Sequence, residues 1–348
     1  MQLFSMAFLC VSTLSLGTLA LSSSANAQAP TMQLTALCST DQGWCELAAK
    51  EFTKRSGIKV LQVHKATGES LAQLKAESEN PKTDIWWGGT GDPFLQAAEE
   101  GLLSPYRPAL FADLLPWSQN QYAISADRVG GFYSSAISFG FNTEVLKRKG
   151  LAAPKCWADL LKPEYKGEIE TANPSSSGGA YTILAGLVAL MGEDKAFDYL
   201  KALHRNVTSY TRSSQAQAKT VGRGEVGMGI SFLHGFLNEI EGGSPVDIAV
   251  PCEGTSYEVG GIALIKGGKN ADAAKKYYDF LMSPEGQQLG AAARSYQQPA
   301  NRKTPPNAKI LQASQLKLVD YDFKKFGASA ERRRLIARWE KEVNGLAK

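Results

Sequence analysis

Apolar and polar positions follow two different periods in the segment that begins at residue 33. Three short apolar runs have the length and composition of buried strands: 33–38, 58–63 and 84–87. Three segments repeat apolar residues at helical spacing: 44–52, 69–79 and 94–100. Gly57 and Gly101 follow the first and third of these as helix ends. This order predicts a parallel, doubly wound α/β sheet flanked by helices.

A second series of elements follows in the rest of the chain. Five more segments have strand character: 132–141, 168–172, 226–231, 246–250 and 257–265. Two segments have helical spacing: 182–191 and 271–282. We predict two α/β lobes with a ligand cleft between them, and chain crossings near residues 135 and 255. The predicted division is 28–135 plus 256–300 for lobe 1, 136–255 for lobe 2, and 301–348 for C-terminal helices without a lobe assignment.

Three loops of small hydroxyl residues and glycines precede predicted helices, at 39–43, 88–93 and 173–181. In doubly wound sheets, ligands bind beyond the carboxyl ends of the strands. Hydroxyls and free backbone N–H groups at the positive end of a helix suit phosphate or carboxylate. The candidate anion ligands are Ser39, Thr40, Gly89, Thr90, Ser175, Ser176 and Ser177. Because helix capping alone explains each single loop, the prediction rests on all three meeting in one cleft.

The first 27 residues differ from the rest of the chain. They carry no charged side chain, are apolar over 3–21, and end in an Ala-x-Ala pattern at Ala25 and Ala27. Together these features predict a cleaved signal peptide, residues 1–27, and export to the periplasm. Polar residues interrupt the apolar stretch, which disfavours the alternative of a membrane anchor.

Cleavage there leaves four cysteines, an even number that favours disulfides in an oxidising compartment. Cys38 and Cys45 are close in sequence, so a local bridge between them is easily formed. That pairing leaves Cys156 and Cys252 for a long-range bridge. The alternative is four free, buried thiols.

Composition and charge narrow the function classes. With 43% hydrophobic and 21% charged residues, the 348-residue chain is expected to be globular, with about two domains. The net charge is +4, and the one basic run, Arg332 to Arg334, is expected on a solvated helix face, so we predict no nucleic-acid partner. Gly89-x-Gly91 does not continue to the third glycine of a GxGxxG motif, the GxxxxGK[ST], HExxH and GxSxG motifs are absent, and the histidines lack metal-ligand spacing. We predict no enzyme activity, no metal and no cofactor.

Aromatic residues near the predicted cleft have different expected roles. Trp86 and Trp87 are neighbours in a strand, so alternation sends them to opposite faces and favours core packing for both. Trp44 stands at the start of a helix on the cleft side and is a candidate for ligand contact.

Several segments together resemble the periplasmic solute-binding proteins of ABC importers. They are CSTDQGWC at 38–45, TDIWWGGTGDP at 83–93, PEYKGEIETANPSSSGGAYT at 163–182, MGISFLHG at 228–235, PCEGTSYE at 251–258 and SPEGQQL at 283–289. Within that class, the chain is similar to the ferric-ion-binding group and its hexose-phosphate and phosphonate-binding relatives. The resemblance implies a type II periplasmic binding protein fold whose two lobes close on a small ligand, a membrane-embedded ABC permease as partner, and a monomer.

The resemblance also bears on the ligand. Ferric binders hold iron with two tyrosines after the strand at 226–231, where this chain has Phe232-Leu233-His234-Gly235. The loop that matches Ser175–Gly178 grips an anion in those relatives, so we predict capture of a small anionic solute that bears phosphate or phosphonate. His234, Glu253 and Tyr257 are the predicted contacts to its organic part.

Two alternatives stay open. One, within the same family, is ferric iron bound together with a synergistic anion. The other is a secreted serine hydrolase that uses one of Ser175, Ser176 and Ser177 as nucleophile and His234 as base.

Overall fold

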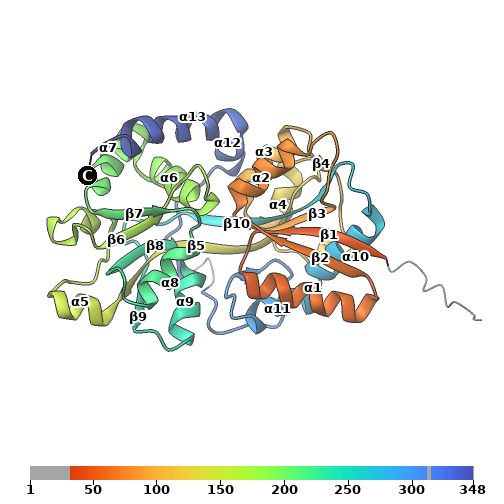
Figure 1. Ribbon diagram of the computed structural model, residues 1–348, viewed down its shortest axis with the longest axis horizontal. Helices are drawn as coiled ribbons and strands as arrows, with labels where there is room; N and C mark the ends of the chain where they lie inside the picture. Colours follow the sequence, from red (N-terminus) through yellow and green to blue (C-terminus); the bar gives the residue numbers. More distant parts are fainter. Residues whose placement is uncertain (1–31, 312–314, 348) are drawn as a thin grey trace, which may run out of the picture. The chain divides into compact units, whose positions relative to one another are not determined.

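The computed structural model describes residues 32–311 and 315–347 (Figure 1). The strands are β1 (Gln33–Cys38), β2 (Lys59–His64), β3 (Ile85–Thr90), β4 (Leu103–Ser104), β5 (Gly130–Asn142), β6 (Ile169–Ala172), β7 (Val207–Thr211), β8 (Met228–Phe232), β9 (Val246–Ala249), β10 (Tyr257–Ile265) and β11 (Gln298–Pro299). The α-helices are α1 (Gln42–Ser56), α2 (Thr67–Ala76), α3 (Gly91–Glu99), α4 (Pro116–Ile124), α5 (Thr143–Lys149), α6 (Gly178–Met191), α7 (Glu193–His204), α8 (Ala216–Gly222), α9 (Leu233–Glu241), α10 (Ala271–Met282), α11 (Pro284–Ala292), α12 (Phe323–Gly327) and α13 (Ser329–Trp339). Shorter helical turns are η1 (Phe111–Asp113), η2 (Trp157–Leu161), η3 (Pro163–Tyr165) and η5 (Glu340–Asn344).

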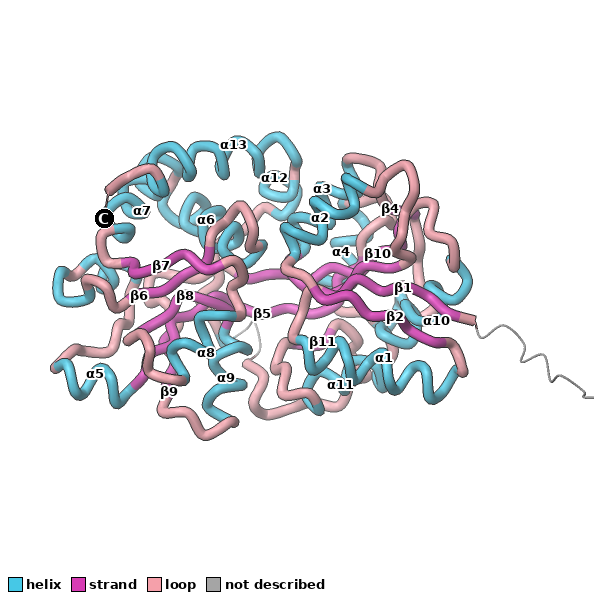
Figure 2. The backbone as a smooth tube through the Cα atoms, in the orientation of Figure 1, coloured by secondary structure: helices cyan, strands magenta, loops and turns pink. Residues whose placement is uncertain are grey.

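The strands hydrogen-bond in the order β2-β1-β3-β10-β5-β8-β6-β7, with β4, β9 and β11 paired beside this path. β1 runs parallel to β2 and β3, and β6 runs parallel to β7 and β8. β5 and β10 are antiparallel to their neighbours and connect the two groups (Figure 2). We call the portion with β1, β2 and β3 the β1 side, and the portion with β6, β7 and β8 the β8 side.

On the β1 side, alternation along the strands divides the core between the two faces of the sheet. Trp87 joins the cluster formed with α1 and α10, which contains Phe52 and Tyr277. Trp86 joins the opposite cluster, formed with α2 and α3, where its ring stacks on that of Phe94 with 3.6 Å between centroids. Both tryptophans are fully buried, which confirms their predicted place in the core.

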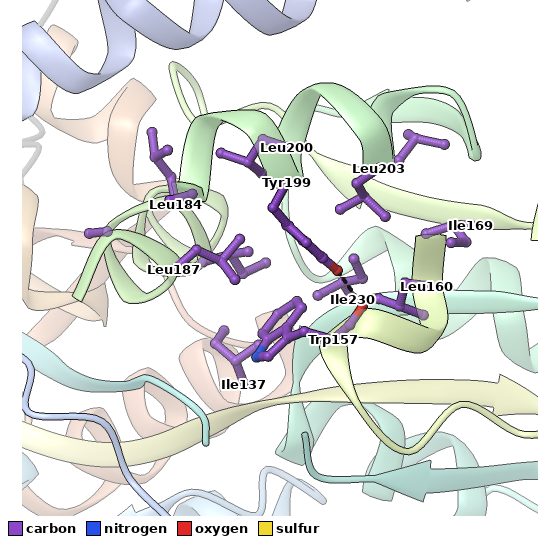
Figure 3. Close-up of a cluster of buried hydrophobic side chains, with 14 of the residues drawn as sticks. Ile137, Trp157, Leu160, Ile169, Leu184, Leu187, Tyr199, Leu200, Leu203 and Ile230 are labelled. Atoms are coloured by element: carbon purple, nitrogen blue, oxygen red, sulfur yellow. Dashed lines mark hydrogen bonds between the residues drawn. The ribbon is translucent and has the colours of Figure 1, made fainter. Parts of the chain in front are cut away.

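The β8 side has a separate and larger core (Figure 3). Helix α6 is apolar on nearly all sides and buries most of its residues there, which is typical of an internal helix. The Trp157 ring lies edge-on to that of Tyr199, and the Tyr199 hydroxyl donates to the carbonyl of Trp157 at 2.7 Å. Such separate cores allow each side to stay packed if the two move relative to each other.

Sequence patterns located most of these elements. The bounds of β10 and α10 agree with the predicted segments, and Gly57 ends α1 in the left-handed conformation. The predicted all-parallel order holds inside each side of the sheet, but β5 and β10 are antiparallel, so the sheet is mixed. The predicted lobe boundaries stay a prediction, and the predicted signal peptide, residues 1–27, lies outside the described residues.

Both predicted disulfides are present. Cys38 is bonded to Cys45, with 6.1 Å between their Cα atoms, and Cys156 is bonded to Cys252 across a separation of 96 residues. Between residues 32 and 347, excluding 312–314, no helix has the length and apolar character required to cross a bilayer.

The predicted solvated face at Arg332 to Arg334 needs a correction. Arg334 does face solvent, where it pairs with Glu193 and Glu331. Arg332 is buried, and its guanidinium lies 4.9 Å from the centre of the Tyr181 ring. The helix α13 thus turns one arginine of this run toward the core, because the aromatic ring offers a favourable face for the cation.

Candidate functional site: a buried anion cavity

A cavity of about 30 Å³ lies where strand ends from both sides meet helix starts. Its walls come from the ends of β1, β3 and β8, from the starts of α2 and α6, and from the loop before α8. The lining residues are Ser39, Ala66, Thr67, Gly89, Thr90, Tyr133, Ser177, Gly178, Gly179, Ser213, Ser214, Gln215, Phe232, His234 and Glu258. Because Lys and Arg are missing from this lining, any anion bound here must be held by neutral donors.

Two glycines allow the opposing walls to approach each other. A Cβ atom on Gly178, at the start of α6, would stand 1.8 Å from Oγ1 of Thr90, at the end of β3. A Cβ atom on Gly68, in the first turn of α2, would stand 2.6 Å from the carbonyl oxygen of Ser176. Both distances are far below van der Waals contact, so side chains at these positions would hold the walls apart.

Helix N-termini supply the positive character of the cavity. α2 and α3 begin without a side-chain cap, so their first-turn N–H groups remain available to a ligand. α6 is capped by Ser177, whose Oγ accepts from the N–H of Ala180 at 3.3 Å and of Ser214 at 3.2 Å. Oγ1 of Thr90 is buried and has no hydrogen-bond partner within the described part of the chain. An anion placed here would satisfy that hydroxyl and the uncapped N–H groups together.

The carboxyl group of Glu258 also lines the cavity. Glu258, on β10, is 3% exposed, and both of its carboxyl oxygens lack a hydrogen-bond partner among the described residues. Burial raises the pKa of Glu258 well above its usual range, and the nearby carboxylates of Asp41 and Asp92 add to the rise. The raised pKa favours the protonated carboxyl group, which can donate a hydrogen bond to an anion.

Two ring side chains complete the walls. The hydroxyl oxygen of Tyr133 accepts from the N–H of Gly89 at 2.6 Å, which fixes the end of β3. Nδ1 of His234 is hydrogen-bonded to Oγ of Ser135 at 2.9 Å. Burial lowers the pKa of His234, so the ring is neutral at pH 7 and can offer its other nitrogen as a donor or an acceptor.

A second, larger chamber of about 230 Å³ adjoins the cavity. The two spaces share four lining residues: Ser214, Gln215, Phe232 and His234. In contrast to the cavity, the chamber is bordered by charged and long polar side chains: Asp41, Gln42, His64, Lys219, Asn238 and Glu239. The pair of spaces thus combines a small compartment of uncharged donors with a wider compartment that carries both signs of charge.

Comparison with known proteins connects this geometry to a family. The model of the bacterial extracellular solute-binding proteins matches residues 80–325. The structure of the periplasmic binding protein AfuA from Actinobacillus pleuropneumoniae, with exogenous fructose-6-phosphate bound, is 41% identical, with a TM-score of 0.88 over 90% of this chain and 99% of that chain. The structure of the periplasmic binding protein P5PA is 37% identical, with a TM-score of 0.86 and the same coverage. A putative 2-aminoethylphosphonate-binding periplasmic protein of Salmonella typhimurium is 26% identical over 86% of this chain and 88% of its own length.

This chain belongs to the bacterial extracellular solute-binding protein family. It is the solute-binding component of an ABC transporter, as predicted. Its fold is the mixed α/β fold of the type II periplasmic binding proteins, with a central sheet and flanking helices, which confirms the predicted fold class.

In this solute-binding protein, the structure brings some of the sequence-predicted residues together. Ser39, Gly89, Thr90, Ser177 and His234 all line the cavity, although they come from four separate segments of the chain. These positions agree with the rule that ligands collect at the carboxyl ends of strands and at helix starts.

Other predicted residues lie elsewhere. Trp44 is 2% exposed, and its ring stacks on that of Phe132 in the core of the β1 side, with 5.1 Å between centroids. Thr40 is buried, and its Oγ1 accepts from Nε2 of Gln297 at 3.3 Å. Trp44 is therefore a packing residue, and its ring faces inward.

The hydroxyls of Ser175 and Ser176 are engaged outside the cavity. Ser175 donates to a carboxylate oxygen of Glu340 at 2.5 Å, and Ser176 donates to the carbonyl of Arg212 at 2.9 Å. Of the three consecutive serines, Ser177 faces the cavity because it is the N-cap of α6.

The two predicted contacts on the segment before β10 also have other surroundings. The Glu253 carboxylate accepts from the backbone N–H groups of Trp157 at 2.8 Å and Ala158 at 3.0 Å, beside the Cys156–Cys252 disulfide. The Tyr257 ring packs edge-on against that of Phe323 at 5.2 Å. Cys156, Cys252 and Glu253 lie close enough together to resemble a metal-ligand group, but the disulfide already uses both sulfur atoms.

Sequence reasoning missed several lining residues: Thr67, Tyr133, Ser213, Ser214, Gln215 and Glu258. Thr67 and the segment 213–215 carry the same signal as the predicted loops, hydroxyl residues just before or at a helix start. Glu258 stands in the strand segment YEVGGIALI, where an isolated carboxyl flanked by apolar residues is a signal for a special environment.

Proposed function

We propose that this protein captures a small organic solute bearing a phosphate or phosphonate group in the periplasm and delivers it to a membrane permease. The observation that carries the proposal is the cavity itself: uncapped helix N-termini, unpartnered Oγ1 of Thr90 and neutral Glu258 surround a space without cationic side chains. Oriented backbone N–H groups and hydroxyls hold phosphate in this way. The phosphorylated or phosphonate ligands in the names of AfuA and of the Salmonella relative agree with it.

The organic part of the solute is proposed to extend into the larger chamber. His234 borders both spaces, so it can contact a solute at the junction between anion and organic group. Asp41 and Glu239 can accept hydrogen bonds from hydroxyl or amino groups, and Lys219 and Asn238 can donate to oxygen atoms. These side chains are suited to a polar, not an apolar, organic group.

The alternative of direct ferric iron binding finds less support in this donor set. Iron(III) requires hard, negatively charged oxygen ligands, whereas the cavity offers N–H and O–H donors and a carboxyl group held neutral by burial. Tyr133, the tyrosine in the lining, has a pKa raised well above its usual range by burial and by Glu258, which disfavours the phenolate.

The alternative of a serine hydrolase requires a hydroxyl paired with a histidine. Oγ of Ser177 accepts from the N–H groups of Ala180 and Ser214, while Nδ1 of His234 is bonded to Ser135. The serine and the histidine are thus bound to different partners, and a nucleophile–base pair is not assembled.

The proposal extends to the chain's organisation. We propose that residues 1–27 direct export and are removed, that residues 28–135 plus 256–300 and residues 136–255 act as the two lobes, and that the mature protein works as a monomer. The predicted cleft between the lobes would then be the location of the cavity, which is lined from both sides of the sheet.

A thermal-shift and calorimetric comparison tests the ligand class. We expect fructose 6-phosphate or 2-aminoethylphosphonate to raise the melting temperature and to give saturable heat of binding, because a ligand of the folded state stabilises it. Fructose and ethanolamine, which lack the anion, serve as matched controls and are expected to give no shift. A shift with iron(III) citrate and none with any phosphorylated or phosphonate compound would contradict the proposal.

A further inference from the structure

An ion pair joins the two walls of the cavity at its outer edge. Glu69 is in the first turn of α2, two residues after Thr67, and its carboxylate pairs with the guanidinium of Arg212. Arg212 directly precedes the segment 213–215 on the opposite wall. The pair therefore links the β1 side to the β8 side next to the anion cavity.

The same edge carries two further polar contacts, one within a wall and one between the walls. Oγ of Ser176 donates to the carbonyl of Arg212, so the arginine is tied to the loop before α6. Nε2 of Gln215 donates to Oδ1 of Asp41 at 3.1 Å, which is a second link between the two sides. These contacts form one continuous polar seam beside the cavity.

Separation of the two walls along this seam would expose the cavity. Thr90 and Ser177 are each 2% exposed and His234 is 4% exposed, so the walls cover these three lining residues. The start of α2 also lies close to the loop before α6, because a Cβ on Gly68 would stand 2.6 Å from the Ser176 carbonyl oxygen. Since Glu69 and Arg212 stand on these two walls, their ion pair must break when the walls separate and form again when they close.

We propose that the Arg212–Glu69 pair is a latch that favours the closed cleft and slows the release of the bound solute. This inference rests on the proposed function, because it assigns a role in solute retention. Arg212 is here a positioning residue: its guanidinium is paired with Glu69 and does not line the cavity.

The size of the effect follows from exposure. The Arg212 side chain is 86% exposed and that of Glu69 is 31% exposed, so water and salt weaken the pair. We expect loss of the pair to increase the dissociation rate about three- to fivefold at low ionic strength, and the difference to shrink in about 1 M salt.

Charge reversal tests the latch. The probe is fructose 6-phosphate, whose dissociation rate is measured by stopped-flow fluorescence for the wild type, Arg212→Glu, Glu69→Arg and the double reversal. We expect faster release from each single variant and near wild-type release from the double variant. The matched control is Arg223→Glu, because Arg223 pairs with Glu225 within one wall, and its release rate is expected to stay unchanged. Equal rates in all variants, or a double variant as fast as the single ones, would overturn the latch.

Small-angle X-ray scattering of the solute-free protein tests the latch without a bound solute. Its result therefore does not depend on whether the proposed ligand class is correct. In the solute-free protein the latch is also expected to favour closure, so Arg212→Glu should increase the radius of gyration at low salt and the double reversal should restore it. An unchanged radius in Arg212→Glu would overturn the latch even if fructose 6-phosphate fails to bind. Failure of wild-type binding together with this radius change would reject the ligand class and retain the latch.

Discussion

The cavity and the adjoining chamber differ in the kind of group that forms their walls. The cavity is built from backbone N–H groups and short hydroxyl side chains, whereas the chamber is bordered by longer, charged side chains such as Lys219 and Glu239. Groups fixed by helix starts recognise one geometry and one charge. Residues that border the chamber can be substituted without disturbing the backbone that holds the anion. The comparison suggests that one compartment sets the ligand class and the other selects the individual solute.

The largest expected effect comes from filling the cavity. Gly178→Val places side-chain atoms where Oγ1 of Thr90 now lies, so the anion compartment should be blocked. We expect affinity for fructose 6-phosphate to fall at least about 100-fold, or about 2.8 kcal/mol. Isothermal titration calorimetry measures the loss. Gly345→Ala is the control, because Gly345 lines neither the cavity nor the chamber and has a φ of −75° that alanine adopts readily, so its affinity is expected to remain near wild type. Equal binding by Gly178→Val would show that the anion lies elsewhere.

A smaller effect is expected from the proton on Glu258. Because burial raises its pKa, the wild type keeps a neutral donor until the pH rises through that folded-state value. The ionised group would then repel the anion, so we expect the dissociation constant of the wild type, relative to Glu258→Gln, to increase about tenfold as the pH rises through that value. Titrations of both proteins at several pH values measure the ratio. A constant ratio would contradict a protonated Glu258 in the ligand-free site.

The raised pKa of Glu258 also makes the free energy of unfolding depend on pH. The folded protein holds the Glu258 proton more tightly than the unfolded chain, so this group favours folding fully only below its unfolded pKa. Its contribution is lost as pH rises from about 4.5 toward the folded-state value. Urea unfolding between pH 4.5 and pH 8 should therefore show a steeper fall in the wild type than in Glu258→Gln. Parallel curves for the two proteins would contradict this assignment.

The smallest expected effect comes from substitutions in the chamber, which test whether the two compartments bind different parts of the solute. Lys219→Met and Glu239→Gln should change affinity for fructose 6-phosphate about two- to fivefold, because exposed polar contacts contribute modestly. The affinity for inorganic phosphate should remain unchanged in both variants, since phosphate alone occupies only the cavity. Competition titrations with the two ligands give both values. An equal loss for phosphate and sugar phosphate would remove the distinction between the compartments.

The sequence predicted the compartment of fixed groups better than the compartment of side chains. Ser39, Gly89, Thr90 and Ser177 were found because hydroxyl and glycine residues at helix starts follow a local rule. Glu258 was missed because its unpartnered state depends on β10 lying in the middle of a mixed sheet, which is a long-range property. β7 was missed because its segment VTSYT is too polar to stand out as a strand.

Where sequence reasoning placed residues differently from the structure, the cause was side-chain direction. Trp44 lies at the helix start that we expected to face a ligand, but aromatic packing with Phe132 and Trp87 turns its ring inward. The consecutive serines 175–177 share one composition, yet only the N-cap position of Ser177 directs a hydroxyl into the cavity. Direction of this kind is set by tertiary packing, which one sequence does not reveal.

A crystal structure of the mature protein with fructose 6-phosphate tests the central claim most directly. We predict that the phosphate occupies the cavity, within hydrogen-bond distance of Oγ1 of Thr90 and the backbone N–H groups at the starts of α2 and α6, with the sugar directed toward Lys219 and Glu239. A phosphate bound in the larger chamber on Lys219, with the cavity filled by sugar or water, would contradict the division between anion binding and solute selection.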